Sequence, residues 1–203
     1  GLTSVAPAEQ PGSIPGDLAR YIDHTLLKPG ATEEQIRALC AEALQYNFRS
    51  VCVNPCWVKR VADGLRGSPV LTCSVVGFPL GANTPEVKAT ETRQAIRDGA
   101  KEIDIVVTRG HVLRGDWESL YEEVRAYRDT CGDAHLKTIL ATGELGTLTN
   151  VHRASLVCMM AGADFIKTST GKEKVNATLP VGLTMARATA TRCCCPPESW
   201  EGK

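Results

Sequence analysis

The sequence predicts an α/β protein with a parallel sheet, and two observations carry this prediction. From residue 21 onward, short apolar segments alternate with longer segments of helical periodicity, a pattern typical of repeated β-α units. The short segments are almost continuously apolar, as expected of strands covered on both faces. We expect these strands at residues 21–26, 50–54, 71–78, 102–108, 136–141 and 164–168.

The segments between the strands carry signals for the start and end of helices. Thr32 begins a capping-box pattern, and Thr84 stands directly before a proline, which is favoured at the first helical position. Gly99 and Gly162 stand where helices should end, because glycine readily adopts the left-handed conformation of a C-terminal cap. We expect helices at residues 32–46, 55–66, 84–98, 116–130, 148–161 and 175–190.

Two folds accommodate this alternation: a doubly wound sheet and a (β/α)8 barrel. A dinucleotide-binding doubly wound sheet requires a Gly-x-Gly-x-x-Gly turn after its first strand, whereas residues 26–30 read LLKPG. The sequence therefore favours the TIM barrel, with about six of its usual eight β-α units. We expect a flexible leader at residues 1–17, the partial barrel domain at 18–190 and a divergent tail at 191–203.

Composition narrows the class of function. The chain has 203 residues with a formal net charge of zero, so neither a nucleic-acid groove nor a membrane-binding surface is expected. No apolar segment approaches the length of a membrane span. Nine cysteines lack the spacing of a disulfide framework, which favours reduced thiols and a cytoplasmic location. Cys52 and Cys56 are close in sequence but have no second ligand pair, so we expect no metal.

Polar residues recur at one position of the expected strands. The segment from Gly99 to Asp104 parallels the segment from Gly162 to Lys167, with both charged residues at the same offset from the glycine. Asp23, Lys137 and Cys52 stand at the matching place in shorter versions of the pattern. Because side chains alternate across a strand, a shared offset predicts a shared side. We expect these five residues to face the barrel interior.

Two interpretations of these interior charges remain open. They could form salt bridges of the core, or they could form a catalytic site. Burying several charges costs several kcal/mol for each ion, and this cost favours the catalytic interpretation, because a protein seldom buries so many charges without using them. A lysine in apolar walls beside a second cation has a lowered pKa, so Lys137 is expected to lower the pKa of Lys167. A neutral Lys167 amine would form an imine with an aldehyde or ketone, and Asp104 would shuttle the proton.

The segment after Lys167 predicts an anion-binding loop. Residues 168–172 read TSTGK, and small residues before a helix suit a phosphate held by backbone N–H groups and by Lys172. The loop is not a Walker A motif, because Ile166 stands where a glycine is required. An ordinary βα loop is the alternative interpretation.

Five segments carry a resemblance to a known family. They are residues 22–27 (IDHTLL), 51–55 (VCVNP), 102–107 (EIDIVV), 136–145 (LKTILATGEL) and 163–172 (ADFIKTSTGK). In this order they resemble the deoxyribose-phosphate aldolase family, especially its animal forms, over about residues 21–187. The resemblance implies a TIM barrel that reversibly cleaves 2-deoxy-D-ribose 5-phosphate to acetaldehyde and D-glyceraldehyde 3-phosphate, in deoxyribose phosphate catabolism, without metal or organic cofactor. Assembly into a homo-oligomer is left open.

The resemblance also implies a role for each matched residue. Lys167 would form the Schiff base, Asp104 would join the proton relay and Lys137 would tune the pKa of the nucleophile. The remaining implied roles are a substrate pocket lined by Asp23, Cys52 and Thr170, and a phosphate site formed by Gly171 and Lys172.

The sequence departs from the family in two places. Thr108 replaces an asparagine that usually ends the fourth strand, a change expected at the pocket edge. After Ala188 the family continues through a glycine-rich strand that carries a second active-site lysine, whereas residues 191–203 contain three adjacent cysteines and two prolines. A frameshift, an alternative exon and a gene-model error would each produce this tail.

These departures predict a poorly soluble or unstable chain with little aldolase activity. Two alternatives follow: a catalytically inactive variant that acts, if at all, as a binding protein, and a Schiff-base aldolase with a different phosphosugar substrate.

Overall fold

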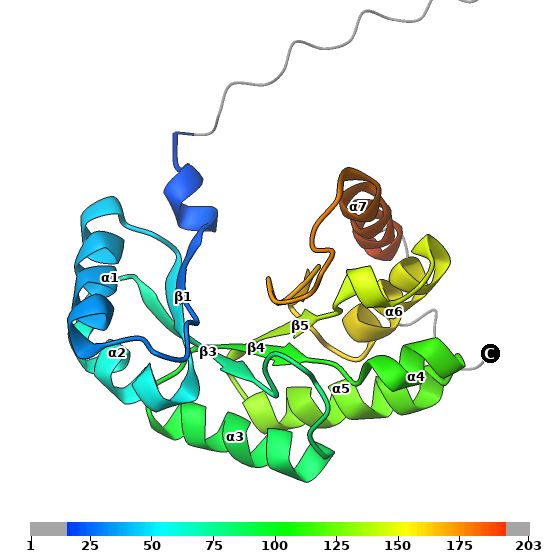
Figure 1. Cartoon of the computed structure of the whole chain (residues 1–203), viewed down its shortest axis with the longest axis horizontal. Helices are drawn as coiled ribbons and strands as arrows, with labels where there is room; N and C mark the ends of the chain where they lie inside the picture. The colour runs from blue at the N-terminus through cyan, green and yellow to red at the C-terminus, as the bar shows by residue number, and fades with distance from the viewer. Residues whose placement is uncertain (1–15, 194–203) are drawn as a thin grey trace, which may run out of the picture.

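A computed structural model describes residues 16–193, and the remainder of the expected leader and tail lies outside these residues. Six parallel strands form one sheet in the order β1 to β6 (Figure 1). The strands are β1 (Asp23–Leu26), β2 (Ser50–Val53), β3 (Leu71–Val76), β4 (Glu102–Val106), β5 (His135–Ile139) and β6 (Phe165–Lys167). The predicted α/β class with six β-α units is confirmed.

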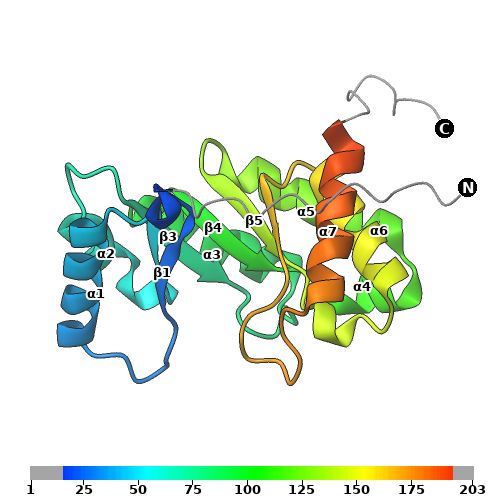
Figure 2. The same ribbon diagram turned by 90° about the horizontal axis from the view of Figure 1, so that it is seen from above.

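Among the described residues, the α-helices lie over the convex side and the two ends of the curled sheet (Figure 1). Seen from above, α1 and α2 lie at the β1 end and α6 and α7 at the opposite end (Figure 2). The main helices are α1 (Glu33–Tyr46), α2 (Val58–Gly64), α3 (Pro85–Arg97), α5 (Trp117–Cys131), α6 (Leu148–Met160) and α7 (Leu179–Cys193). Within the described residues the sheet does not close, because β1 pairs only with β2 and β6 only with β5.

The predicted helix starts are present. Thr32 accepts from the backbone N–H of Gln35, whose side chain accepts from the N–H of Thr32, which completes the capping box. Thr84 caps α3 by accepting from the N–H of Val87. Each cap satisfies N–H groups that have no partner within the helix.

Several elements differ from the prediction. The first strand begins at Asp23, because the Ile22 N–H closes a 3-10 helix at Leu18–Tyr21 by donating to Ala19. A short helix that was not expected, α4 (Arg109–Arg114), follows β4 and ends at a left-handed Gly115. The last helix begins at residue 179 rather than 175 and extends three residues into the expected tail. Two more 3-10 helices, Pro55–Trp57 and Thr142–Glu144, lie in loops.

The strand register assigns one side of the sheet to the core and the other to polar groups. Val51, Ile103 and Leu136 alternate with the polar strand residues and pack in the main apolar cluster against the helices. Asp104 and Lys137 are direct partners across β4 and β5 and point to the opposite, concave side. The predicted division of the strand residues between core and interior therefore matches the structure.

A second group of charges lies buried in the helical layer. Lys88 of α3 donates to Glu123 of α5 at 3.0 Å, and the hydroxyl of Tyr127 donates to the same carboxylate at 2.7 Å. Thr108 donates to Glu123 at 2.5 Å and accepts from Lys88 at 3.1 Å. The expectation that Thr108 edges the pocket is therefore wrong, because its hydroxyl joins this network between α3 and α5.

This network predicts a large loss of stability when one ion is removed. Glu123→Ala leaves the Lys88 ammonium buried without its partner, which is expected to lower the free energy of unfolding by about 3–5 kcal/mol. The double variant Lys88→Met/Glu123→Leu should recover most of the loss. Arg125→Ala, which removes the exposed pair with Asp129, should change the free energy by less than about 0.5 kcal/mol. Chemical denaturation measures all three, and equal effects of Glu123→Ala and Arg125→Ala would contradict the account.

Candidate active site

The concave face brings together the five predicted residues from five different strands. Asp23, Cys52, Asp104, Lys137 and Lys167 come from β1, β2, β4, β5 and β6. Their shared orientation follows from the pairing, since partners in a parallel sheet point to the same side. The five side chains, which are scattered over the sequence, thus form one polar surface on an otherwise apolar sheet.

Lys167 is the lysine of this surface that is open to approach. Its Nζ donates to Asp104 Oδ2 and lies 3.4 Å from Asp23 Oδ2. The Lys167 side chain is 31% exposed, whereas the side chain of Lys137 is only 6% exposed. A small molecule that reaches the concave face therefore meets the Lys167 amine before that of Lys137.

Lys137 is held by carboxylates on several sides. Its Nζ lies 2.8 Å from Asp23 Oδ2, 2.5 Å from Glu102 Oε2 and 3.5 Å from Asp104 Oδ1. Glu102 is fully buried and also pairs with Arg49 at 3.2 Å. These contacts fix the ammonium at the centre of the face and compensate its burial.

The pKa of Lys167 requires a correction. Burial lowers the pKa of an ammonium, but the paired Asp104 carboxylate outweighs burial and raises the pKa of Lys167 above its usual value. Burial likewise acts to lower the pKa of Lys137, and the surrounding acidic groups again raise it. The expectation of a lowered pKa for Lys167 is therefore wrong for this arrangement, because its ammonium pairs with Asp104 and lies close to Asp23.

Asp23 links the two lysines. Burial acts to raise the pKa of Asp23, but Lys137, Ser50 and Lys167 together lower it below the usual value. Ser50 contributes a hydrogen bond of 2.8 Å from its hydroxyl. Asp23 is therefore ionised under all conditions near neutrality and holds both ammonium groups in place.

A cavity of about 390 Å³ opens beside these charges. Its walls are formed by Arg20, Tyr21, Asp23, Arg49, Glu102, Lys137, Phe165, Ile166 and Lys167. Three of the predicted residues, Asp23, Lys137 and Lys167, thus line one opening that is large enough for a small molecule.

The predicted anion-binding loop follows β6, with Gly171 and Lys172 exposed. The backbone N–H of Thr170 donates to the carboxylate of Glu173 at 3.0 Å. That N–H is therefore occupied by a carboxylate of the chain, and the exposed Gly171 and Lys172 remain available to a ligand. The structure records no contact between Lys172 and the paired charges on the concave face.

Sequence reasoning missed Cys73, Glu102 and Arg109. Cys73 and Glu102 are register partners on the concave face, and Glu102 could have been found because it stands two residues before Asp104. Arg109 joins three loops by contacting the Pro79 carbonyl at 2.8 Å, Glu144 at 2.5 Å and Glu173 at 3.5 Å. No signal in the sequence marks this arginine, because its partners are distant along the chain.

Comparisons with known proteins agree with this geometry. Residues 18–195 match the family described as DeoC/LacD family aldolase. Human deoxyribose-phosphate aldolase is 47% identical over 191 residues, which cover 83% of this chain and 59% of the human protein. The Streptococcus gordonii enzyme is 51% identical over 162 residues, covering 80% of this chain and 73% of that protein. The chain therefore spans about three fifths of the length of its human relative.

Solved structures show the same fold. A deoxyribose phosphate aldolase from Aeropyrum pernix, described as having a unique tetrameric structure, superposes with a TM-score of 0.75 at 31% identity, covering 86% of this chain and 73% of that chain. Among the described residues, no helix combines the length and apolarity needed to cross a bilayer.

The lowered pKa of Asp23 predicts how stability depends on pH. A carboxyl whose folded pKa is depressed stabilises the fold above its unfolded pKa, and this contribution disappears as pH falls through the folded pKa. Asp23→Asn should therefore lower the free energy of unfolding at neutral pH, and its difference from the parent should shrink below about pH 4.

Chemical denaturation across a pH series measures this difference. Asp133→Asn, at an exposed position, serves as the control and should change the free energy by less than about 0.5 kcal/mol. A constant effect of Asp23→Asn down to strongly acidic pH would contradict the assigned ion pairs.

Proposed function

Because the chain belongs to the DeoC/LacD family of aldolases, we propose that it is a Schiff-base lyase with Lys167 as its nucleophile. The proposed reaction is the reversible cleavage of 2-deoxy-D-ribose 5-phosphate to acetaldehyde and D-glyceraldehyde 3-phosphate, in deoxyribose phosphate catabolism. One observation carries the proposal: an accessible lysine at a cavity wall donates directly to a buried carboxylate. This pair supplies a nucleophile and a proton acceptor in contact.

Asp104 activates Lys167 by proton transfer. Since the raised pKa keeps Lys167 protonated at rest, its ammonium must first pass a proton to Asp104. The neutral amine then attacks the substrate aldehyde, and loss of water gives an iminium. The iminium accepts the electron pair of the breaking carbon–carbon bond, while the substrate hydroxyl gives up its proton. Glyceraldehyde 3-phosphate leaves, the resulting enamine takes up a proton at carbon to give the acetaldehyde iminium, and water hydrolyses this iminium to acetaldehyde and the free amine.

Lys137 acts on the return of this proton from Asp104, not on its uptake. Its ammonium lies 3.5 Å from Asp104 Oδ1 and is itself neutralised by Asp23 and Glu102. A fixed positive charge beside Asp104 stabilises the carboxylate form to which the proton relay returns. Lys137 would thus tune the relay rather than depress the pKa of Lys167 directly.

The substrate phosphate is proposed to bind the loop after β6. Gly171 and Lys172 are exposed there, so the Gly171 backbone N–H and the Lys172 ammonium would face the phosphate. Thr170 supports the turn by accepting from the N–H of Lys172 at 3.1 Å. Thr170 and Cys52 are proposed to border the sugar.

The cellular setting is proposed from the thiols. All six cysteines whose side chains the structure describes are free, which agrees with a reducing cytoplasmic compartment. Assembly into a homo-oligomer is a further proposal, supported by the tetrameric structure described for the Aeropyrum pernix relative.

Trapping of the imine tests the nucleophile. Incubation of the protein with acetaldehyde and borohydride should add one ethyl group to Lys167, because an imine on this amine is reduced in place. Peptide mapping by mass spectrometry locates the group. Lys167→Arg should lose the specific label, and Lys172→Ala should keep it. Labelling spread over surface lysines would favour the alternative of an inactive variant that acts as a binding protein.

Steady-state kinetics test the phosphate site. Lys172→Ala should raise KM for 2-deoxy-D-ribose 5-phosphate about tenfold to a hundredfold, because it removes a hydrogen bond between charged groups. Turnover of unphosphorylated 2-deoxy-D-ribose should be unchanged. Lys174→Ala, at an exposed position two residues further on, is the matched control. An equal effect on both substrates would refute the phosphate role of Lys172.

A further inference from the structure

We propose that Cys52, Cys73 and Asp104 form a binding site for one thiophilic divalent cation, Zn²⁺ or Cd²⁺, on the concave face of the sheet. We further infer that the bound cation blocks imine formation, because it takes the Asp104 carboxylate away from Lys167. The second statement rests on the proposed function, whereas the first does not.

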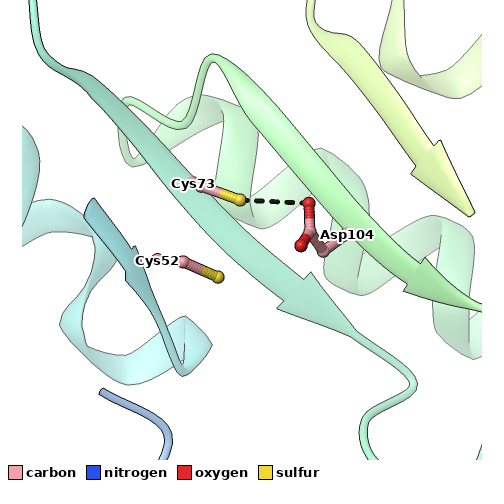
Figure 3. A group of neighbouring side chains, drawn as sticks. All are labelled: Cys52, Cys73 and Asp104. Atoms are coloured by element: carbon pink, nitrogen blue, oxygen red, sulfur yellow. Dashed lines mark hydrogen bonds between the residues drawn. The ribbon is translucent and has the colours of Figure 1, made fainter. Parts of the chain in front are cut away.

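The three side chains converge from adjacent strands. Cys52 of β2 and Cys73 of β3 are direct register partners, and Figure 3 shows Cys73 directed toward Asp104 with Cys52 beside them. The Cys73 Sγ lies 3.2 Å from Asp104 Oδ1, and all three ligand atoms lie within 4.8 Å of one another. Within residues 16–193, this is the one group of three or more His, Cys, Asp or Glu side chains that is so placed.

The spacing fits a tetrahedral cation without movement of the backbone. With metal–sulfur bonds of about 2.3 Å, neighbouring ligand atoms lie about 3.8 Å apart in a tetrahedral site. The Cys73–Asp104 separation is about 0.6 Å shorter than this at 3.2 Å and no pair of ligand atoms is more than 4.8 Å apart, so small side-chain rotations are sufficient. All three residues are buried on β-strands, which hold their backbones in place. The fourth position would be taken by water.

The donor set selects the class of cation. Two sulfurs and one carboxylate oxygen are ligands typical of zinc and of softer divalent cations. Mg²⁺ and Ca²⁺ prefer sites built entirely from oxygen and are not expected to bind. The site differs from the Cys52 and Cys56 pair considered from sequence, because Cys56 is exposed whereas Cys52 is buried.

Binding leaves the net charge of the concave face unchanged. Each thiol releases one proton to solvent as its sulfur bonds the cation, so two protons leave when one divalent cation enters. Burial, the neighbouring Cys52 and Asp104 raise the pKa of the Cys73 thiol, so its proton leaves as the sulfur bonds the cation. The Lys137 ammonium, 3.9 Å from the sulfur, acts in the opposite direction.

The proposed site is tested by titrating the full chain with Cd²⁺. Four cysteines outside the site are first replaced, so that they cannot bind the cation. Cys56, Cys193, Cys194 and Cys195 are changed to serine, since Cys56 is exposed and the side chains of the other three lie outside the described part of the structure. Calorimetry gives stoichiometry and affinity, and sulfur-to-cadmium charge-transfer absorption reports thiolate ligation.

One Cd²⁺ per chain is expected. Cys52→Ser and Cys73→Ser should each weaken binding by more than about a hundredfold, a larger loss than removal of an outer-shell partner causes. Cys158→Ser, which alters an equally buried thiol on the helical side of the sheet, should leave affinity unchanged. Binding unaffected by the first two variants, or weakened equally by the third, would overturn the proposal.

A second measurement keeps Cys52 and Cys73 unchanged, so its result does not depend on whether the variants at these two positions fold. In the same background and without denaturant, Cd²⁺ should slow the alkylation of Cys52 and Cys73 by iodoacetamide, as read by peptide mapping. Cys158 should not be protected. Equal protection of all three would mean that the cation only stabilises the fold at another place, and would overturn the site.

A separate experiment tests whether the bound cation blocks imine formation at Lys167. Cd²⁺ at saturation should reduce borohydride trapping of acetaldehyde at Lys167 at least tenfold. Undiminished trapping with Cd²⁺ bound would refute inhibition but not the site. If Lys167 is not trapped even without Cd²⁺, the proposed aldolase function fails, while the binding and protection data still decide the metal site.

Discussion

Mutual neutralisation of buried charges on the concave face is the constraint on which the rest of the structure depends. Asp23, Glu102 and Asp104 offer three carboxylates, and Lys137 and Lys167 offer two ammonium groups. Removing such groups from water costs several kcal/mol for each ion unless each meets its partners at close range. The pairs join strands at opposite ends of the sheet, so a slip of one residue in any strand would send a charge into the apolar layer under the helices. The site and the register of the sheet are therefore specified together.

The apolar side and the loops complete this arrangement. Amphipathic helices cover the convex side with aliphatic residues, and the buried pair of Lys88 and Glu123 connects α3 to α5. Arg109 then ties together the loops that follow β3, β5 and β6. The loop that carries Lys172 is thereby positioned near the strand that ends in Lys167. The proposed nucleophile and phosphate loop thus share one rigid support, which is the arrangement that catalysis by positioning requires.

Much of the fold and the membership of the site could be predicted from the sequence, because both follow from local periodicity. Asp104 and Lys167 stand at equal offsets from helix-ending glycines, and this was sufficient to place them on one side of the sheet. The direction of the Lys167 pKa could not be predicted, since it depends on distances between strands that are far apart in the sequence. Cys73 was missed for the same reason: its partners Cys52 and Asp104 become neighbours only through strand pairing. Thr108 was misplaced because the residue after a strand no longer follows the alternation.

The central claim is that one accessible lysine reacts while its buried neighbour only supports it. The difference rests on geometry, since both lysines line the cavity and have raised pKa values, but the side chain of Lys167 is far more exposed than that of Lys137. The most direct measurement is a crystal structure of the protein after reduction with borohydride in the presence of 2-deoxy-D-ribose 5-phosphate. The account predicts continuous electron density from Lys167 Nζ into the cavity, with Asp104 within hydrogen-bond reach of the adduct. Density on Lys137, or an adduct at Lys167 turned away from Asp104, would contradict it.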